Sequence, residues 1–387
     1  MKKLMLAALV AGALVLAASA SAATREDGEG NAAVTLAVYG DAPYGIQPPA
    51  GPLDLTAFQR TPAFVAAVNA DPAVDLVLHV GDIHSGSERC YATPAANPVG
   101  GVSDQGIFDL WKAFQDPVVY TPGDNEWADC TKKKENTPAD SYYDPTQAGH
   151  LPGDPLDNLA LVRSTFFAHP GLTLGQHKRL VLSQGVLDPR YRSYVENVMW
   201  IQAGVVFVTI NLPGSNNDLV PWYGGWSKPQ NPRQLAESAD RTAADQAWLD
   251  AAFKVAKLVR AKGVLIGAQA DMWDPAALPK NPNDGLDGYD GIVQQLAALT
   301  RDFAKPVLLV NGDSHVFGAD KPLSQPFYDA TSTTVGDVHH VGYTVDNFQR
   351  VTVEGSTNAP ANWYLRLKVD PASTQVFSWQ PVRLALP

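Results

Sequence analysis

The stretch Val34-Thr35-Leu36-Ala37-Val38-Tyr39-Gly40-Asp41 is an apolar run that ends in a Gly-Asp pair. Three similar segments follow it: His79-Val80-Gly81-Asp82, Thr121-Pro122-Gly123-Asp124 and Val310-Asn311-Gly312-Asp313. Each run predicts a buried strand, and each pair predicts a turn at the carboxyl end of that strand. Because the carboxyl ends of parallel strands share one sheet edge, we expect the four aspartates to converge on one crevice.

Short runs rich in Val, Leu and Ile alternate with helical patterns along most of the chain. The predicted strands are Val34–Tyr39, Leu76–Val80, Val118–Thr121, Val205–Ile210, Val264–Ile266 and Val307–Val310. The predicted helices are Leu55–Ala70, Gly106–Phe114, Pro155–Phe167, Ala236–Ala261 and Asp287–Phe303. This alternation predicts an α/β protein with a mostly parallel sheet and helices packed on its faces. Three strand-like runs without a helix between them are expected to complete a second sheet: Phe348–Glu354, Trp363–Val369 and Val376–Trp379.

The N-terminus has the pattern of a secretory signal peptide. Lys2 and Lys3 precede the apolar run Leu4–Ala18, and the small residues Ser19–Ala23 follow it. A transmembrane span needs about 20 apolar residues, and this run is shorter. We therefore predict a signal peptide at residues 1–22 and a single domain at residues 23–387. The mature protein is expected to be secreted or periplasmic, without membrane insertion.

The mature chain is acidic. Without residues 1–22 it has 27 basic and 40 acidic residues, a net charge of −13. Nucleic acid binding is not expected, because a phosphate backbone requires a basic face. Carboxylates gathered in a confined space raise one another's pKa, but a bound cation can neutralise them. Metal binding is therefore our hypothesis for the four aspartates, and four ordinary turns are the alternative.

Two cysteines, Cys90 and Cys130, are present in the whole chain. In an exported protein they are expected to form a disulfide, which would close a loop of about 40 residues and stabilise the fold by roughly 4 kcal/mol. Two buried free thiols are the alternative.

The motifs resemble those of the calcineurin-like metallophosphoesterases. That family carries, in order and after sheet strands, Asp-x-His, Gly-Asp-x-x-Asp, Gly-Asn-His-Asp/Glu, a lone His and Gly-His-x-His. The corresponding segments in this chain are Asp41-Ala42-Pro43, Gly81–Ser85, Gly123–Glu126, Gln269 and Gly312–His315. Order, strand context and spacing agree over roughly residues 33–318. The resemblance implies a four-layer α/β/β/α sandwich of the metallo-dependent phosphatase type.

Three positions match the ligands of the family pattern. By the resemblance, Asp41 binds a first metal, Asp82 bridges two metals, and His315 is the closing imidazole of the last motif. Pro43, in contrast, stands where the family has a ligand His and has no side-chain donor. His84, two residues after Asp82, is either a substitute ligand or a hydrogen-bonding partner of a neighbouring loop.

Three further positions exchange family ligands for oxygen donors. Asp124 replaces an Asn, while Gln269 and Asp313 each replace a His. We therefore predict one or two divalent metal ions, with the ligands Asp41, Asp82, Asp124, Gln269, Asp313 and His315. Because carboxylate and amide oxygens suit hard cations, Mg, Mn or Ca is favoured over Zn or Fe.

Two pairs of residues are candidates for catalysis and substrate binding. Asn125 stands where the family has the His that assists the leaving group, so Asn125, His84 or water is expected to take that role. Asn211 and Asn216 belong to a polar cluster after a strand and are predicted to face the substrate. Turns rich in Asn and Asp have the same appearance.

Two functions are consistent with these observations. The first is an exported metal-dependent phosphoesterase that hydrolyses a small-molecule phosphate mono- or diester through a metal-bound water. The second is a non-catalytic metal- or ligand-binding module on the same fold, because Pro43 and Asn125 replace two motif histidines. We favour the hydrolase, since most of the replacements keep coordinating atoms.

Overall fold

A computed structural model describes residues 32–45, 55–86, 90, 103–129, 154–222, 229–277, 285–328, 334–359 and 361–386. The predicted signal peptide lies outside these residues, as does Cys130, so the signal peptide and the Cys90–Cys130 disulfide stay predictions. Among the helices of the described residues, none has the length and apolar character that crossing a membrane requires.

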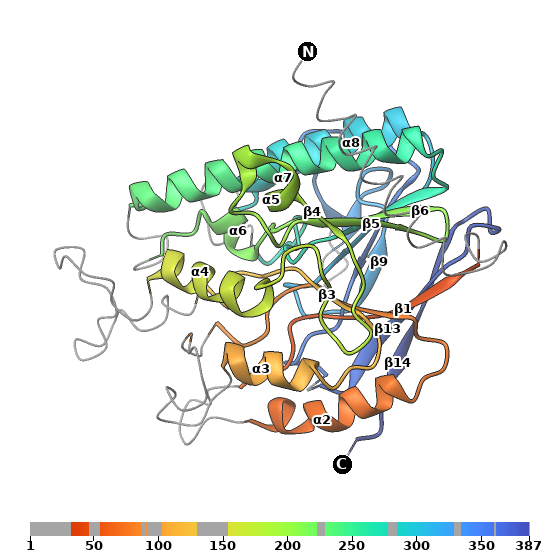
Figure 1. Ribbon diagram of the computed structural model, residues 1–387. Coiled ribbons are helices and arrows are strands. Elements are labelled where there is room, and N and C mark those ends of the chain that lie inside the picture. The colour runs from red at the N-terminus through yellow and green to blue at the C-terminus, as the bar shows by residue number, and fades with distance from the viewer. Residues whose placement is uncertain are drawn as a thin grey trace.

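Two sheets form the centre of the fold (Figure 1). The five-stranded sheet has the order β14 (Phe377–Arg383), β13 (Trp363–Val369), β1 (Val34–Tyr39), β2 (Leu76–His79) and β3 (Val118–Tyr120). The seven-stranded sheet has the order β4 (Leu182–Ser183), β5 (Val198–Gln202), β6 (Val205–Thr209), β7 (Gly263–Gly267), β8 (Val307–Asn311), β12 (Phe348–Thr352) and β9 (Gly318–Asp320). A separate hairpin pairs β10 (Phe327–Tyr328) with β11 (Thr334–Val335).

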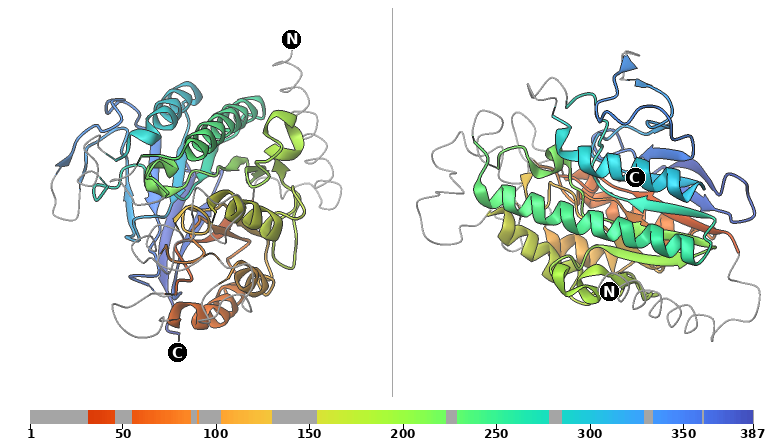
Figure 2. Two further views of the ribbon diagram at one scale, coloured as in Figure 1. Left: turned by 90° about the vertical axis from the view of Figure 1, so that its left-hand side faces the viewer. Right: turned by 90° about the horizontal axis from the view of Figure 1, so that it is seen from above.

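Helices cover the outer faces of both sheets (Figures 1 and 2). The five-stranded sheet is covered by α2 (Thr56–Asn69), α3 (Asp104–Trp111) and α4 (Pro155–Phe166). The seven-stranded sheet is covered by α7 (Pro232–Leu258) and α8 (Asp290–Phe303). The short elements are α5 (Gln184–Leu187), η4 (Pro189–Tyr191), α6 (Gly214–Asp218) and η7 (Asp287–Tyr289). The predicted α/β class and the four-layer sandwich are confirmed.

Apolar cores fill the spaces between the layers. Between the two sheets, Val38 and Leu78 pack in one cluster with Phe207 and Leu265, and each of the four is at most 1% exposed. Further clusters join each sheet to its own helices. Because both faces of each sheet are covered, the central strands are apolar over most of their length.

The pairing of the strands differs from the expectation of one mostly parallel sheet. β1, β2 and β3 are parallel in one sheet, whereas β6, β7, β8 and β12 are parallel in the other. The C-terminal strands are also divided, because β12 pairs with β8 while β13 and β14 extend from β1 in antiparallel order. Uniformly apolar strands carry no alternation that would identify their partners, so the sequence predicted the strands without their pairing.

The hairpin from β5 to β6 was not predicted. Its turn residues, Ala203 and Gly204, have φ values of 48° and 64°. Two residues with positive φ are typical of the type I′ turn that suits a two-residue hairpin. Ala-Gly lacks the Asn or Asp that usually marks this turn in a sequence. The sequence therefore gave little indication that β5 and β6 form a hairpin.

Helix α3 begins with a side-chain cap that can be tested. The buried Ser103 Oγ accepts a hydrogen bond from the Gly106 N–H at 3.2 Å. Ser103→Ala leaves this N–H without its acceptor and should lower the free energy of unfolding by about 1 kcal/mol, measured by urea denaturation. Ser103→Thr keeps the hydroxyl and should lose less. Equal stability of the Ala variant and the wild type would contradict a contribution from the cap.

Candidate metal centre

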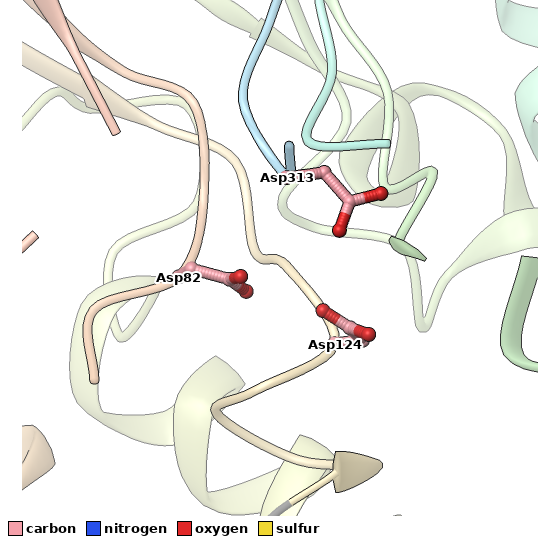
Figure 3. Close-up of side chains that lie close together, drawn as sticks. All are labelled: Asp82, Asp124 and Asp313. Atoms are coloured by element: carbon pink, nitrogen blue, oxygen red, sulfur yellow. The ribbon is translucent and has the colours of Figure 1, made fainter. Parts of the chain in front are cut away.

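The four predicted aspartates lie at the carboxyl ends of strands from both sheets. Asp41, Asp82 and Asp124 follow β1, β2 and β3, whereas Asp313 follows β8 of the other sheet. Asp82, Asp124 and Asp313 each offer a carboxylate oxygen within 4.8 Å of the other two, and Figure 3 shows the three side chains facing a common space. Asp41 adjoins them, because the Asp313 N–H lies 3.0 Å from each Asp41 carboxylate oxygen.

The glycines of the Gly-Asp pairs make room for neighbouring carboxylates. A Cβ atom at Gly123 would lie 2.0 Å from Asp82 Oδ1, and one at Gly312 would lie 2.4 Å from Asp41 Oδ2. Asp41, Asp82 and Asp313 themselves have φ values of 48°, 59° and 75°. This left-handed conformation costs an L-residue roughly 1–2 kcal/mol, and such strain concentrates at functional sites.

Burial and the neighbouring carboxylates both oppose ionisation of Asp41, Asp82 and Asp313. Burial raises the pKa of Asp41 to about 8, and the charges of Asp124 and Glu126 also raise it. Burial and the neighbouring carboxylates likewise raise the pKa of Asp82 and of Asp313 well above the usual range. A divalent cation would relieve this repulsion, so this set of carboxylate oxygen donors fits such an ion.

Hydrogen bonds from three side chains hold the Asp82 carboxylate. Asn125 donates from Nδ2 at 2.8 Å and from its backbone N–H at 3.1 Å, and the Tyr44 hydroxyl donates at 3.1 Å. Gln269 donates from Nε2 at 3.0 Å, while its Oε1 accepts a hydrogen bond from the Gly214 N–H. The Gln269 nitrogen therefore faces Asp82, and its predicted role as an oxygen ligand stays a prediction.

His315 lies beside the aspartates. Its Nε2 is 3.7 Å from Asp41 Oδ1 and 3.2 Å from the Tyr44 hydroxyl, and its Nδ1 is 2.6 Å from Thr357 Oγ1. Burial lowers the pKa of His315 to about 4, so the imidazole is neutral near pH 7. Neutral imidazole is the form that binds metal ions.

Tyr44 was missed by the sequence reasoning. Its buried hydroxyl lies among Asp41, Asp82, Asn125 and His315, at 3.5, 3.1, 3.0 and 3.2 Å from the nearest polar atom of each. The one local signal was its place directly after Ala42-Pro43, where the expected ligand His is missing. Tyr44 thus links the first motif to the rest of the centre.

Removing the Tyr44 hydroxyl should disturb the centre without removing a charge. Tyr44→Phe takes a hydrogen-bond donor from Asp82, so we expect cation affinity to fall by about 10-fold, measured by calorimetric titration with Mn²⁺. Tyr191→Phe, at a partly exposed tyrosine of η4, is the matched control and should bind Mn²⁺ like the wild type. Unchanged affinity in Tyr44→Phe would contradict the role given to this hydroxyl.

Asn125 and His84, the two predicted catalytic residues, have different surroundings. Asn125 contacts Asp82 and Tyr44 directly. His84 is buried, with Nδ1 3.4 Å from the Ser85 carbonyl oxygen and Nε2 3.8 Å from Cys90 Sγ. Asn125 is therefore in direct contact with one of the aspartates, and catalytic participation of either residue stays a prediction.

Asn211 and Asn216, the two predicted substrate contacts, are engaged with protein groups. Asn211 is buried and donates from Nδ2 to Glu196 at 2.8 Å. Asn216 donates to Asp287 at 2.7 Å and accepts from the Gly288 N–H at 2.8 Å. These contacts support the loops around the centre, and binding of substrate by either residue stays a prediction. Ser215, between them in the chain, instead contacts Asp124 through Oγ at 2.7 Å.

Comparison with known proteins gave one family match. The model of the calcineurin-like phosphoesterase family matches residues 54–255, a range that includes Asp82 and Asp124. TT1561 of Thermus thermophilus is a similar solved structure, with 9% identity, a TM-score of 0.37 and coverage of 91% of this chain and 99% of that chain. Purple acid phosphatase PPD1 from yellow lupin (Lupinus luteus) seeds has 11% identity, a TM-score of 0.36 and coverage of 92% and 54%, respectively. The comparison with curated proteins found no match.

Proposed function

Because the chain belongs to the calcineurin-like phosphoesterase family, we propose that it is an exported metal-dependent hydrolase of a small-molecule phosphate mono- or diester. The convergence of the buried Asp82 and Asp124 with the partly exposed Asp313, and with Asp41 beside them, is the observation that carries the proposal. The N-terminal sequence is the basis for placing the mature protein outside the cytoplasm, secreted or periplasmic. The acidic mature chain supports a small substrate over nucleic acid.

The four aspartates and His315 would hold one or two divalent cations. Two such ions would balance the four carboxylate charges, and the excess of oxygen donors favours Mg, Mn or Ca. When bound, the cation would polarise phosphoryl oxygens and lower the pKa of a water molecule. Asn125, Gln269 and Tyr44 would fix the orientation of Asp82 through the hydrogen bonds described above.

Asn125 limits how the site can assist departure of the leaving group. Its amide can donate a hydrogen bond to a leaving group but cannot give up a proton at neutral pH, and its Nδ2 already lies 2.8 Å from Asp82. Loss of a general acid lowers a rate by about 10²–10⁴-fold. We therefore propose a preference for esters whose leaving group needs no protonation, with His84 as the second candidate for a proton donor.

A chromogenic phosphoester screen with metal analysis tests the proposed function. The purified mature protein should hydrolyse an aryl phosphate mono- or diester with Mg, Mn or Ca, and an alkyl phosphate much more slowly. Chelation should abolish both activities, and re-addition of the cation should restore them. No turnover with Mg, Mn, Ca or Zn at any pH from acid to alkaline would overturn the proposal. Metal analysis that finds zinc as the one stoichiometric ion would contradict the preference for hard cations.

The non-catalytic module is supported by the same Asn125 position, where no titratable group stands. It predicts that cations raise the melting temperature while no phosphoester is turned over. Activity that depends on Asp82 would exclude it.

A further inference from the structure

The segment Gly214–Asp218 (α6) is a left-handed helical turn beside the metal centre. Ser215, Asn216, Asn217 and Asp218 have φ values of 55°, 57°, 58° and 59°, and the Leu219 N–H closes the turn on the Ser215 carbonyl at 3.1 Å. The left-handed conformation costs about 1–2 kcal/mol per residue, although Asn and Asp tolerate it better than most. Four consecutive residues remain in it only where the surroundings hold them there.

The turn contacts three of the predicted metal-binding residues. Ser215 Oγ lies 2.7 Å from Asp124 Oδ2 and 2.9 Å from Asp129 Oδ2, so its one proton is shared between two carboxylates, of which Asp124 is the nearer. The Gly214 N–H donates to Gln269 Oε1, whose Nε2 in turn donates to Asp82. The backbone also approaches closely, because a Cβ atom at Gly214 would lie 2.7 Å from Asp313 Oδ1. The conformation of this one turn therefore fixes the surroundings of carboxylates from both sheets.

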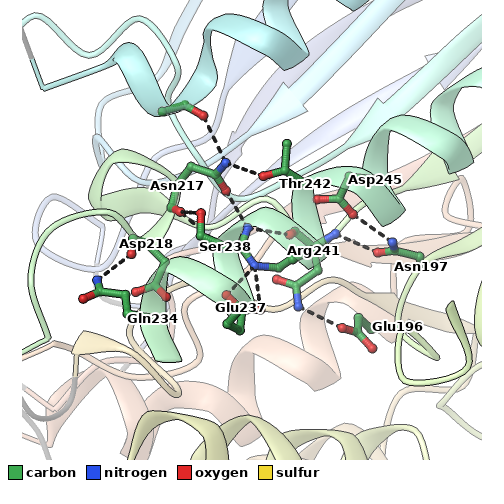
Figure 4. Close-up of polar contacts among 12 residues, drawn as sticks. Glu196, Asn197, Asn217, Asp218, Gln234, Glu237, Ser238, Arg241, Thr242 and Asp245 are labelled. Atoms are coloured by element: carbon green, nitrogen blue, oxygen red, sulfur yellow. Dashed lines mark hydrogen bonds and ion pairs between the residues drawn. The ribbon is translucent and has the colours of Figure 1, made fainter. Parts of the chain in front are cut away.

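Arg241 of α7 connects the turn to the helical layer (Figure 4). The guanidinium is fully buried and donates to both oxygens of Asn217, to its side-chain Oδ1 and to its carbonyl at 3.1 Å. It also donates to the Asn211 carbonyl at 3.3 Å and pairs with Glu237 at 3.0 Å. Burying a guanidinium is unfavourable unless its donors are satisfied, and here most of those contacts lie on or next to the turn.

We propose that Arg241 is a positioning residue for the cation site, because it holds the left-handed turn that places Ser215 against Asp124 and Gly214 against Gln269. This inference rests on the proposed cation site. A carboxylate ligand whose free oxygen accepts a hydrogen bond is held in one orientation, and loss of such a partner typically weakens metal binding by about 10–100-fold. Arg241 and Ser215 are thus expected to act through the same turn.

The test measures the dissociation constant for Mn²⁺ of the full mature protein after chelation, by titration calorimetry. Ser215→Ala should weaken binding by about 10–100-fold. Arg241→Lys keeps the charge but loses the planar fork, and should weaken binding similarly.

Asn217→Gly changes the other partner of the Arg241–Asn217 contact, and it serves as the test if Arg241→Lys does not fold. Glycine adopts φ > 0 freely, so this change removes the contact between Arg241 and the Asn217 side chain without adding backbone strain, and it leaves the contact with the carbonyl of residue 217 in place. Ser164→Ala, at an exposed serine of α4, is the matched control.

A double-mutant cycle gives the decisive comparison. If Arg241 acts through the turn, Ser215→Ala combined with Asn217→Gly should bind Mn²⁺ no more weakly than the weaker single variant. Full additivity, or wild-type affinity in Asn217→Gly, would overturn the inference while leaving the proposed function intact. Lower unfolding free energy with an unchanged dissociation constant would show a purely structural role and would also overturn it. A wild-type protein with no affinity for Mn²⁺, Mg²⁺ or Ca²⁺ would overturn the cation site itself.

Discussion

Asp82→Asn should lower phosphoester hydrolysis by about 10³-fold or more. The substitution keeps the size of the side chain but removes one negative charge from the centre of the cluster. It also sets an NH₂ group against Asn125 in either amide orientation, because Asn125 donates to both Asp82 oxygens in the wild type, from Nδ2 to Oδ2 and from its backbone N–H to Oδ1. Cation stabilisation of a phosphoryl transition state is worth several kcal/mol, and each 1.36 kcal/mol corresponds to a factor of about ten. Initial rates with an aryl phosphate at saturating cation measure the loss.

Asp104→Asn is the matched control for this prediction. Asp104 is also a buried aspartate, but it begins helix α3 and is not a member of the carboxylate group that faces the cation site. Its replacement should lower the rate far less than Asp82→Asn does, because the charge that it removes lies outside that carboxylate group. Comparable rates in Asp82→Asn and the wild type would remove Asp82 from the site and favour a non-catalytic module.

The stability of the metal-free protein should fall as the pH rises from about 4 to about 8. Folding raises the pKa of Asp41 from 3.8 to about 8 and raises those of Asp82 and Asp313 as well. Over this interval the folded state therefore binds more protons than the unfolded state, and the free energy of unfolding decreases with increasing pH. Urea denaturation of the chelated protein at pH 5 and pH 8 measures the difference. Mn²⁺ at 100 times its dissociation constant should restore about 2.7 kcal/mol at pH 8.

Other carboxyl groups have the opposite pH dependence, but their contributions change below about pH 4, and a variant assigns the change between pH 5 and pH 8 to the cluster. Asp109 and Asp188, for example, have pKa values lowered by Lys112 and Arg190, respectively. Asp82→Asn removes one member of the cluster and leaves these groups in place. The variant should lose less stability than the wild type between pH 5 and pH 8. Equal losses of unfolding free energy in both proteins would mean that repulsion within the cluster does not cause the pH dependence.

The sequence predicted the aspartates because their signal is local. An apolar run followed by Gly-Asp identifies a strand and the turn after it, and four such segments lie at the carboxyl ends of β1, β2, β3 and β8. The expected convergence occurs, although at the adjoining edges of two sheets. The division into two sheets depends on which strands pair, and strands that are apolar on both faces do not record this.

The contacts that organise the centre could not be read from the sequence. Asp41 and Asp313 are 272 residues apart, and Gln269 and Asp82 are 187 apart, so the folded chain alone brings each pair together. Tyr44 lacked a motif, and Ser215 lay in a polar stretch that looked like an ordinary turn. A left-handed turn held by a buried arginine is a tertiary arrangement, for which local propensity gives almost no signal.

The position of the centre between two sheets has a mechanical consequence. Asp41, Asp82 and Asp124 belong to one half of the sandwich and Asp313 to the other, so an ion shared among them would be a cross-link between the halves. Packing errors in the interface of Val38, Leu78, Phe207 and Leu265 would then shift the two halves and spread the ligands apart. Metal occupancy and inter-sheet packing would therefore rise and fall together.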